Sequence, residues 1–206
     1  MPDLFDRARS EPMTLEEYSA DFRRRRRDPN GAGEAWKLER RQFFSDPDDP
    51  PWVAFSRGRW HESLRLMEGT RSTYREYYEE TRAQGVTHYR VRVVEEPVQP
   101  YVQWEFHYLM IPAGAGERIR VLRSDRVEEH ERDGPLPEII ATGTGAVYEV
   151  LYSPDGRPTG ARRTTDAESG RRCAELVKAL YAAGEDLETY FEREIEHLDP
   201  PRLEAR

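Results

Sequence analysis

A strand pattern between two stretches of helical periodicity restricts the fold of this chain more than any other feature. Across Tyr89–Val93 apolar and basic residues alternate, as a strand with one buried face requires. Before it, Trp52–Glu68 and residues 70–84 carry apolar or aromatic residues at helical spacing. After it, Pro100 suits the first position of a helix that runs to about Ile111. Helices and strands in alternation predict an α/β domain.

The second half of the chain adds strand patterns separated by turn residues. Residues 112–117 are predicted to form a loop that leads into a strand over residues 118–122. Residues 138–142 and 147–152 suit a hairpin that turns at Gly143-Thr144-Gly145, and residues 157–163 suit a further strand. The expected architecture is a single mixed β-sheet of about five strands flanked by helices, with an α+β arrangement as the alternative.

The ends of the chain define its expected domain organisation. Thr14 and Glu17 have capping-box spacing and predict a short helix to about Arg27 within a polar leader over residues 1–33. Asp166 can cap a helix to about Ala182, and a last helix is expected over residues 186–198. We therefore expect one domain over residues 34–198, followed by a frayed tail over residues 199–206.

Charge and composition limit the classes of function. The chain has 206 residues and a formal net charge of −8, which disfavours a general phosphate-binding surface. One basic block, Arg23–Arg27, leaves nucleic-acid binding as the last of three alternatives, against a solvated segment balanced by nearby acids. Cys173 is the single cysteine, and the sequence contains neither an apolar run of membrane-spanning length nor a signal-peptide pattern. A cytoplasmic location is expected.

The sequence contains no complete catalytic or metal-binding motif. The five histidines and Cys173 lack zinc-ligand spacing, and there is no Gly-x-Ser-x-Gly elbow. The glycines near residues 114 and 143 do not complete a dinucleotide-binding fingerprint. We therefore expect no catalytic residue, metal or cofactor.

Two clusters of polar and aromatic residues remain as candidates for a binding site. One is centred on the residues that follow Trp36, and the other joins the strand across Tyr89–Val93 to the helix that follows it. The candidate residues are Trp36, Glu39, Arg40, Arg41, Arg90, Arg92, Gln103, Trp104, Glu105 and His107. An arginine of the strand and Glu105 of the helix can form a charge-assisted pair. The same side chains can line a cleft for an anionic ligand, or simply fix the helix to the sheet.

Three blocks of sequence carry a resemblance to a known family. They are WKLERRQFFSDPDDPPWVAFSRGRW, RVRVVEEPVQPYVQWEFHYLMIPAGAGERIRVL and GPLPEIIATGTGAVYEVLYSPDGRPTG. Together they resemble an uncharacterised actinobacterial family, one of the domains of unknown function, over roughly residues 35–195. Members of that family are often encoded beside helix-turn-helix regulators and their small partner proteins. The resemblance implies a regulatory context and such a regulator, or its small partner, as a binding partner.

The order of elements also looks like half of a phospholipase-D-like domain. Active members of that class need a His-x-Lys motif, because the histidine is the phosphoryl nucleophile and the lysine holds the phosphate. None of the five histidines here is followed by lysine two positions later. The resemblance therefore implies the fold of a degenerate, ligand-binding member without the activity.

These observations favour a non-catalytic regulatory or sensor module that binds a small ligand or a partner protein beside Arg90, Arg92, Trp104 and Glu105. The alternative is an enzyme of unassigned type in specialised metabolism, with Glu39, Glu105 or His107 as general acid or base. Homo-oligomers are compatible with either hypothesis.

Overall fold

The computed structural model describes residues 9–26 and 32–203, and within them eight strands form one mixed sheet. The strands are β1 (Glu11–Thr14), β2 (Gly33–Glu39), β3 (Val86–Val94), β4 (Arg118–Arg123), β5 (Glu138–Ala141), β6 (Val147–Tyr152), β7 (Pro158–Thr164) and β8 (Glu185–Asp186). Their order is β1-β7-β6-β5-β2-β3-β4-β8, with β2, β3 and β4 parallel and all other pairs antiparallel. The predicted mixed sheet is confirmed, with eight strands rather than five.

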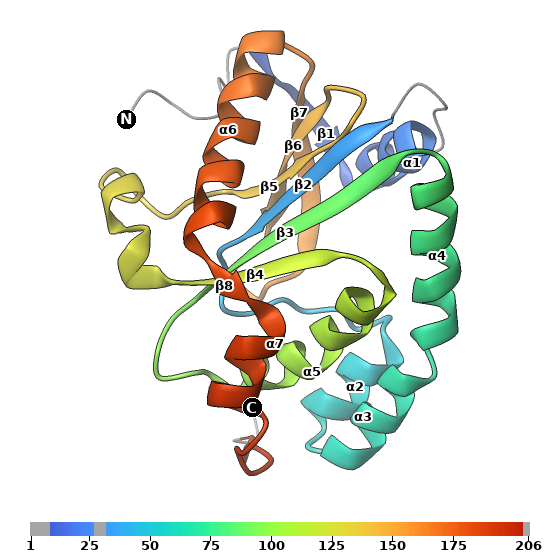
Figure 1. Ribbon diagram of the computed structural model, residues 1–206, viewed down its shortest axis with the longest axis vertical. Helices are drawn as coiled ribbons and strands as arrows, with labels where there is room; N and C mark the ends of the chain where they lie inside the picture. The colour runs from blue at the N-terminus through green and yellow to red at the C-terminus, as the bar shows by residue number, and fades with distance from the viewer. Residues whose placement is uncertain (1–8, 27–31, 204–206) are drawn as a thin grey trace.

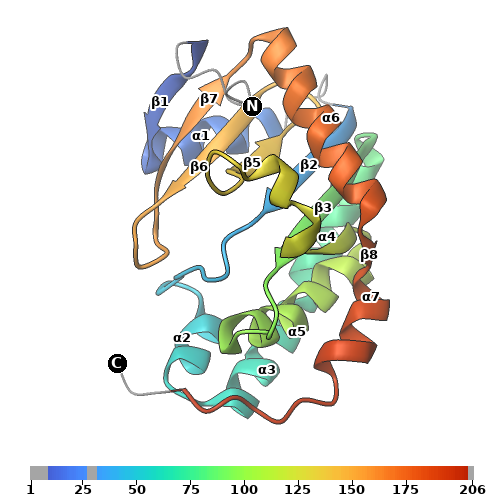
Figure 2. The same cartoon turned by 90° about the vertical axis from the view of Figure 1, so that its left-hand side faces the viewer.

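The helices cover both faces of this sheet. They are α1 (Leu15–Arg26), α2 (Pro50–Ser56), α3 (Trp60–Glu68), α4 (Arg71–Ala83), α5 (Pro100–Ala115), α6 (Ala167–Ala183) and α7 (Leu187–Tyr190), the last continued by a π-helical turn over Phe191–Ile195. Short 3₁₀ turns occupy Ser124–Arg126 and Glu128–His130. Figure 1 shows α6 crossing in front of the sheet, α4 along its right side, and α2, α3 and α5 gathered at its lower end. The view turned by 90° shows the same three helices together below the strands (Figure 2).

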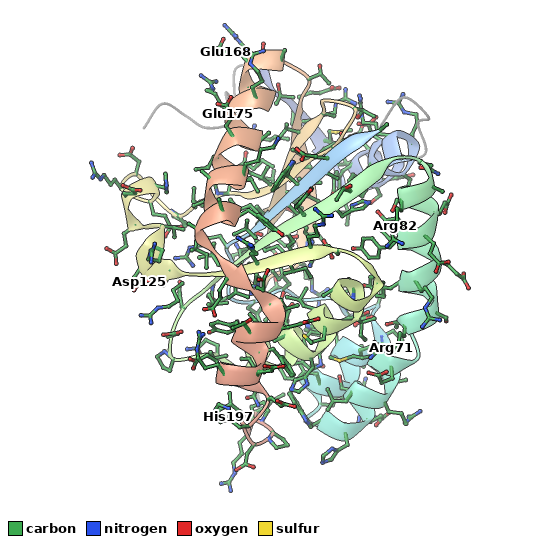
Figure 3. All side chains as sticks on the ribbon, viewed as in Figure 1. Arg71, Arg82, Asp125, Glu168, Glu175 and His197 are labelled. Carbon is green, nitrogen blue, oxygen red and sulfur yellow. The ribbon has the colours of Figure 1, made fainter. Side chains whose placement is uncertain are left out.

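Alternating side chains divide the hydrophobic core into two main parts. On one face Leu38, Val91 and Val93 pack with Val177 and Leu180 of α6. On the opposite face α5 packs against β4, and α1 packs against β6 and β7. The outer side of α6 is charged, as the exposed side chains of Glu168 and Glu175 show in Figure 3. The face opposite α6 holds the candidate site.

Two predicted elements were wrong for local reasons. The helix expected over Trp52–Glu68 is two helices, because the chain turns at Gly58, whose φ is +70°. A residue with a side chain rarely adopts that conformation, whereas glycine does so readily. The first four residues of the loop expected over residues 112–117 are instead the last turn of α5, which ends at Ala115 and is followed by Gly116, with φ of +120°. The remaining predicted strands and helices are present, with shifts at their ends.

The N-terminal helix begins with the predicted capping box. The Thr14 backbone N–H donates to Glu17 Oε2 at 2.8 Å, and the Glu17 N–H donates to Thr14 Oγ1 at 3.2 Å. The segment expected as a leader also contributes β1, which pairs with β7 at the edge of the sheet. The fold therefore includes residues 11–26, while Arg27 lies outside the described residues.

Asp21 fixes α1 to the sheet through several donors at once. Its Oδ2 accepts hydrogen bonds from the Tyr148 hydroxyl at 2.7 Å, Arg163 Nη1 at 2.8 Å and Arg25 Nε at 3.0 Å. The carboxylate also pairs with Arg24. These donors join α1 to β6 and β7 around one nearly buried charge.

We expect Asp21→Asn to lower the free energy of unfolding by about 1–2 kcal/mol, because charge-assisted hydrogen bonds become neutral ones. Urea denaturation followed by tryptophan fluorescence measures the change. Glu16→Gln is the matched control, since it removes the same charge from an exposed position of the same helix. Equal stability of the two variants would contradict this role for Asp21.

Among the described residues, none of the helices has the length and apolar character needed to cross a membrane.

Candidate functional site

The face of the central strands opposite α6 carries charged side chains. In the parallel pairing of β2 with β3, Lys37 lies beside Arg90 and Glu39 lies beside Arg92. Since strand side chains alternate, all four belong to the same face, while Leu38 points to the core under α6. The middle of the sheet therefore has one apolar face and one charged face.

Both arginines of this face are held by carboxylates. Arg90 Nη1 donates to Glu39 Oε2 at 3.1 Å, and its Nε and Nη2 each donate to Glu117 at 3.0 Å. Arg92 Nε donates to Glu105 Oε2 at 2.8 Å, and its Nη2 lies 2.6 Å from the same oxygen. The sequence-based expectation that an arginine of the strand pairs with Glu105 of the following helix is thus met by Arg92.

The environment shifts the pKa values of the two glutamates in opposite directions. Burial alone would raise the pKa of Glu39, but the charges of Arg90, Lys37 and Arg92 outweigh it and lower that pKa. For Glu105 burial prevails over the neighbouring charge of Arg92 and raises the pKa. Glu39 is therefore held as a carboxylate, whereas protonation of Glu105 is favoured relative to a solvent-exposed glutamate.

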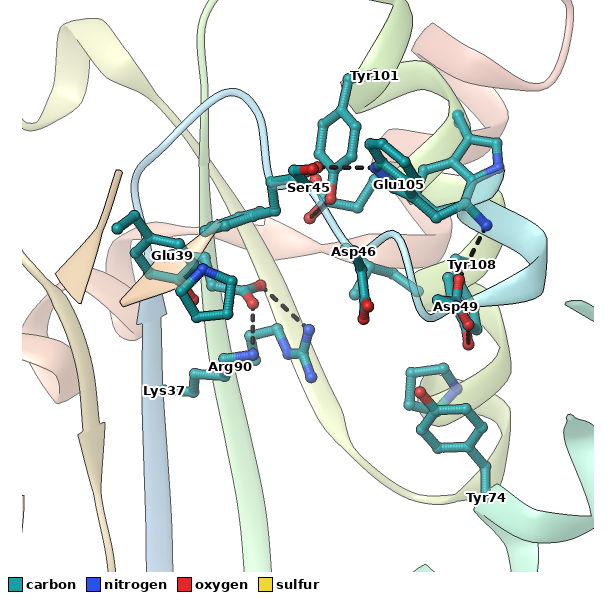
Figure 4. Close-up of a pocket in the computed structure, with 17 residues that line it drawn as sticks. Lys37, Glu39, Ser45, Asp46, Asp49, Tyr74, Arg90, Tyr101, Glu105 and Tyr108 are labelled. Atoms are coloured by element: carbon teal, nitrogen blue, oxygen red, sulfur yellow. Dashed lines mark hydrogen bonds and ion pairs between the residues drawn. The ribbon is translucent and has the colours of Figure 1, made fainter. Parts of the chain in front are cut away.

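A cavity of about 350 Å³ opens beside this charged face. We call it the large cavity, because it is larger than the adjoining cavity of about 220 Å³ between α1 and the sheet. Its floor is formed by β2 and β3, one wall by α5 and another by the loop that joins β2 to α2 (Figure 4). The lining residues are Lys37, Glu39, Phe44, Ser45, Asp46, Asp49, Trp52, Tyr74, Arg90, Tyr101, Trp104, Glu105, Tyr108, Leu109, Pro112, Tyr152 and Pro158. Seven of these are aromatic, and the carboxyl end of a parallel strand is a common place for ligand sites in α/β sheets.

Hydrogen bonds fix the loop that forms the outer wall. Asp49 caps α2, since its Oδ2 accepts the Trp52 backbone N–H at 2.9 Å, and its Oδ1 accepts the Tyr108 hydroxyl at 3.3 Å. The Trp52 indole N–H donates to the Phe44 carbonyl at 2.9 Å. The wall is thereby attached to α5, and Figure 4 shows Asp46, Asp49 and Tyr108 across the cavity from Glu39 and Arg90.

Four of the ten candidate residues line the large cavity, namely Glu39, Arg90, Trp104 and Glu105. Arg92 is 0% exposed and lies beneath the surface, where it supports Glu105. Arg92 therefore serves the second role considered from the sequence, because its ion pair with Glu105 fixes the helix to the sheet.

The other five candidates lie elsewhere in the fold. Trp36 stacks on Tyr89 on the α6 face, with ring centroids 4.2 Å apart. His107 packs against Trp60 and Phe191. The remaining three make polar contacts with loops or the C-terminal segment: Gln103 with the Asp199 carbonyl, Arg40 with Glu95 and Glu131, and Arg41 with the Ser153 carbonyl.

Sequence reasoning named Trp104 of the aromatic wall but not Tyr101 or Tyr108 as site residues, and it missed the acidic loop of the cavity. Tyr101, Trp104, Tyr108 and Pro112 recur at three- and four-residue steps, so they share one face of α5 with Glu105. That periodicity was available in the sequence. Asp46 and Asp49 gave no comparable signal, because only the folded β2–α2 loop brings them to the cavity.

The basic block of α1 is largely engaged within the protein where the structure describes it. Arg24 and Arg25 pair with Asp21, and Arg23 Nε donates to the Ser19 carbonyl at 3.1 Å. In the described ranges, no group of three or more His, Cys, Asp and Glu side chains is placed to hold a metal ion. Cys173 is buried, and burial raises the pKa of its thiol to about 11, which disfavours the reactive thiolate.

Comparison with known proteins gave a family but no characterised relative. The model of the family described as "Domain of unknown function (DUF6879)" matches residues 20–192, which is most of the chain. The match begins within α1, earlier than the sequence blocks that carried the resemblance. Neither the curated proteins nor the solved structures gave a match, so the likeness to phospholipase-D-like domains stays a sequence-based expectation.

Proposed function

We propose that this chain, which belongs to the DUF6879 family of domains of unknown function, is a non-catalytic binding module whose small-molecule ligand occupies the large cavity. The observation that carries the proposal is a cavity of about 350 Å³ with seven aromatic side chains on its walls. Ligand sites of proteins typically combine this size with an apolar or aromatic lining and a few fixed polar groups.

The partners of the acidic groups support binding rather than acid–base catalysis. Glu39 Oε1 lies 2.5 Å from Lys37 Nζ, and its Oε2 accepts from Arg90. Glu105 Oε2 is paired with Arg92, and its Oε1 accepts the Tyr101 hydroxyl at 3.4 Å. Each carboxylate oxygen already has a protein partner, so neither glutamate presents an unoccupied oxygen to a substrate.

The ion pairs of Arg90 and Arg92 also argue against an anionic ligand, which the sequence had left open. Every side-chain nitrogen of Arg90 and Arg92 lies within hydrogen-bond or ion-pair distance of an oxygen of the protein. An anion would have to displace a buried carboxylate, and breaking a buried pair leaves an uncompensated charge. A neutral or cationic molecule with an aromatic or apolar body suits the cavity better.

The biological setting is part of the proposal. We place the protein in the cytoplasm, since its single cysteine favours a reducing compartment. A regulatory or sensor role, with a helix-turn-helix regulator or its small partner protein as the partner, follows from the family resemblance of the sequence blocks.

Blocking the large cavity is expected to weaken ligand binding strongly. Asp46 and Asp48 are exposed acids of the same loop, but Asp46 alone of the two lines the cavity. We expect Asp46→Trp to weaken fragment binding at least tenfold, because the indole occupies the space of the ligand. Asp48→Trp is the matched control and should bind as the wild type does.

Saturation-transfer NMR with a set of aromatic amines, alcohols and carboxylic acids makes this measurement. Fragments that bind Asp46→Trp as well as the wild type would contradict the large cavity as the ligand site. A set in which no fragment binds the wild type would contradict it equally.

An enzyme that uses Glu39 and Glu105 is the second candidate, and one observation favours it. Two carboxyl groups of one cavity have pKa values shifted in opposite directions, a pattern that often separates a base from an acid. Incubation of bound fragments with the protein, followed by proton NMR, distinguishes the candidates. Conversion by the wild type but not by Glu39→Gln supports the enzyme, whereas unchanged fragments support the binding module.

A further inference from the structure

A second cavity, of about 220 Å³, lies between α1 and the sheet. We call it the small cavity. Its walls are mainly apolar and include Leu15 and Tyr18 of α1, together with Ile140 and Val150 of the sheet. Lys37, Tyr152 and Pro158 line both cavities, so the two adjoin.

Glu138 is the acidic residue among those that line this apolar space. Its side chain is buried, with 7% of the residue surface exposed. Oε1 accepts the backbone N–H groups of Arg40 at 2.9 Å and Arg41 at 2.7 Å. Oε2 is buried and has no hydrogen-bond partner among the described residues. A buried acceptor without a donor is unfavourable, so this oxygen is a point where a ligand gains a hydrogen bond that the protein lacks.

We propose that the small cavity is a subsite for the ammonium group of an amine with an apolar body, and that Glu138 Oε2 accepts its hydrogen bond. The inference deepens the proposed function and rests on it, since the body of a longer ligand would extend into the large cavity. The ligand class proposed for the small cavity is therefore the primary amines.

The surrounding charges favour an amine over an anion or a neutral alcohol. Lys37, the cation of the small cavity, is already paired with Glu39 at 2.5 Å. Glu138 has no such cation at its Oε2, so a positively charged donor gains a charge-assisted hydrogen bond there. The net charge of −8 also attracts cations to the protein.

Titration of phenethylammonium chloride into ¹⁵N-labelled protein at pH 8 tests the subsite. We expect the amide signals of Arg40 and Arg41 to shift, because these N–H groups donate to the carboxyl that receives the amine. 2-Phenylethanol, the neutral analogue of the same shape, is expected to bind at least tenfold more weakly.

Two variants and a control connect the binding to the small cavity. Glu138→Gln removes the charge and is expected to weaken amine binding at least tenfold, and Leu15→Trp, at a 39% exposed position, is expected to block the cavity from its rim. Glu16→Gln removes an exposed charge beside Leu15 and should leave binding unchanged. The ¹⁵N spectrum of each variant without amine shows whether it is folded.

The outcomes separate this inference from the proposed function. Amine binding that shifts only Ser45, Asp46 and Trp52 and is lost in Asp46→Trp but kept in Glu138→Gln would overturn the subsite and support the large cavity. Absence of amine binding would also overturn the subsite, while the fragment experiment alone decides the large cavity. Glu138-dependent amine binding without any Asp46-sensitive fragment would leave the small cavity as the ligand site on its own.

Discussion

Arg92→Met is expected to lower the free energy of unfolding by about 3–5 kcal/mol, the cost typical of removing one partner of a buried ion pair. Among the residues that the structure describes, Arg92 has the largest fully buried side chain, and its guanidinium joins β3 to α5 through Glu105. Methionine fills much of the volume but leaves Glu105 buried without its cation. Urea denaturation at pH 8, followed by far-ultraviolet circular dichroism, measures the loss.

The double variant Arg92→Met/Glu105→Leu shows whether the loss comes from the unpaired charge. Because well-packed apolar residues often replace a buried ion pair at little cost, we expect the double variant to recover most of the stability. A single variant as stable as the wild type would show that Arg92 does not hold the fold. A double variant less stable than the single one would show that packing, rather than charge, dominates at this place.

The elements that the sequence predicted well are those whose residue spacing or first residues match their position in the fold. β3 alternates because one of its faces is apolar, and α5 begins at Pro100, a residue suited to the first turn of a helix. α6 begins after Asp166, whose Oδ2 accepts the Ser169 N–H at 2.9 Å as a helix cap. In each case a short stretch of sequence contains the physical cause of the element.

The strand β2 was missed because one of its two faces carries charged residues. Lys37 and Glu39 alternate with Trp36 and Leu38, but a pattern of charges suggests a solvated surface unless their partners are known. Lys37 pairs with Glu39 of the same strand, but the second partner of Glu39 is Arg90 of β3, about 50 residues along the chain, and only the parallel register places it there. The ion pair that joins β2 to β3 is therefore tertiary, and no local pattern encodes it.

The candidate site was predicted in part for a related reason. Arg90, Trp104 and Glu105 were found because a strand and the next helix must pack together, which brings their facing residues close. Gln103 and His107 were included although they lie on other sides of the same helix. Most residues of α5 are buried, so hydrophobicity does not distinguish its faces, and the three- and four-residue spacing was the better guide.

Glu138 was missed because its properties depend on burial. The sequence shows one acid at the start of a strand among forty acidic residues. In the fold, burial and the nearby negative charge of Glu39 raise the pKa of Glu138 to about 7. The hydrogen bonds from the Arg41 and Arg40 N–H groups and the charge of Arg92 lower this pKa, but they do not outweigh the burial. Lys37 and the hydroxyls of Tyr18 and Tyr152 complete the polar side chains of the small cavity.

Glu138→Gln is expected to make the stability of the domain less dependent on pH. The pKa of Glu138 is about 7 in the folded protein against an ordinary value of 4.5, so the folded state holds a proton that the unfolded chain has already released between these values. Stability from this group is complete below pH 4.5 and is lost as pH rises to about 7. Since each pKa unit corresponds to about 1.4 kcal/mol, the wild type should lose about 2–3 kcal/mol more than Glu138→Gln between pH 5 and pH 8.

Urea denaturation across this range measures the difference, with Glu16→Gln as the control that keeps the wild-type slope. Parallel pH profiles for wild type and Glu138→Gln would show that Glu138 has an ordinary pKa, and that its carboxyl is hydrated rather than buried in the small cavity.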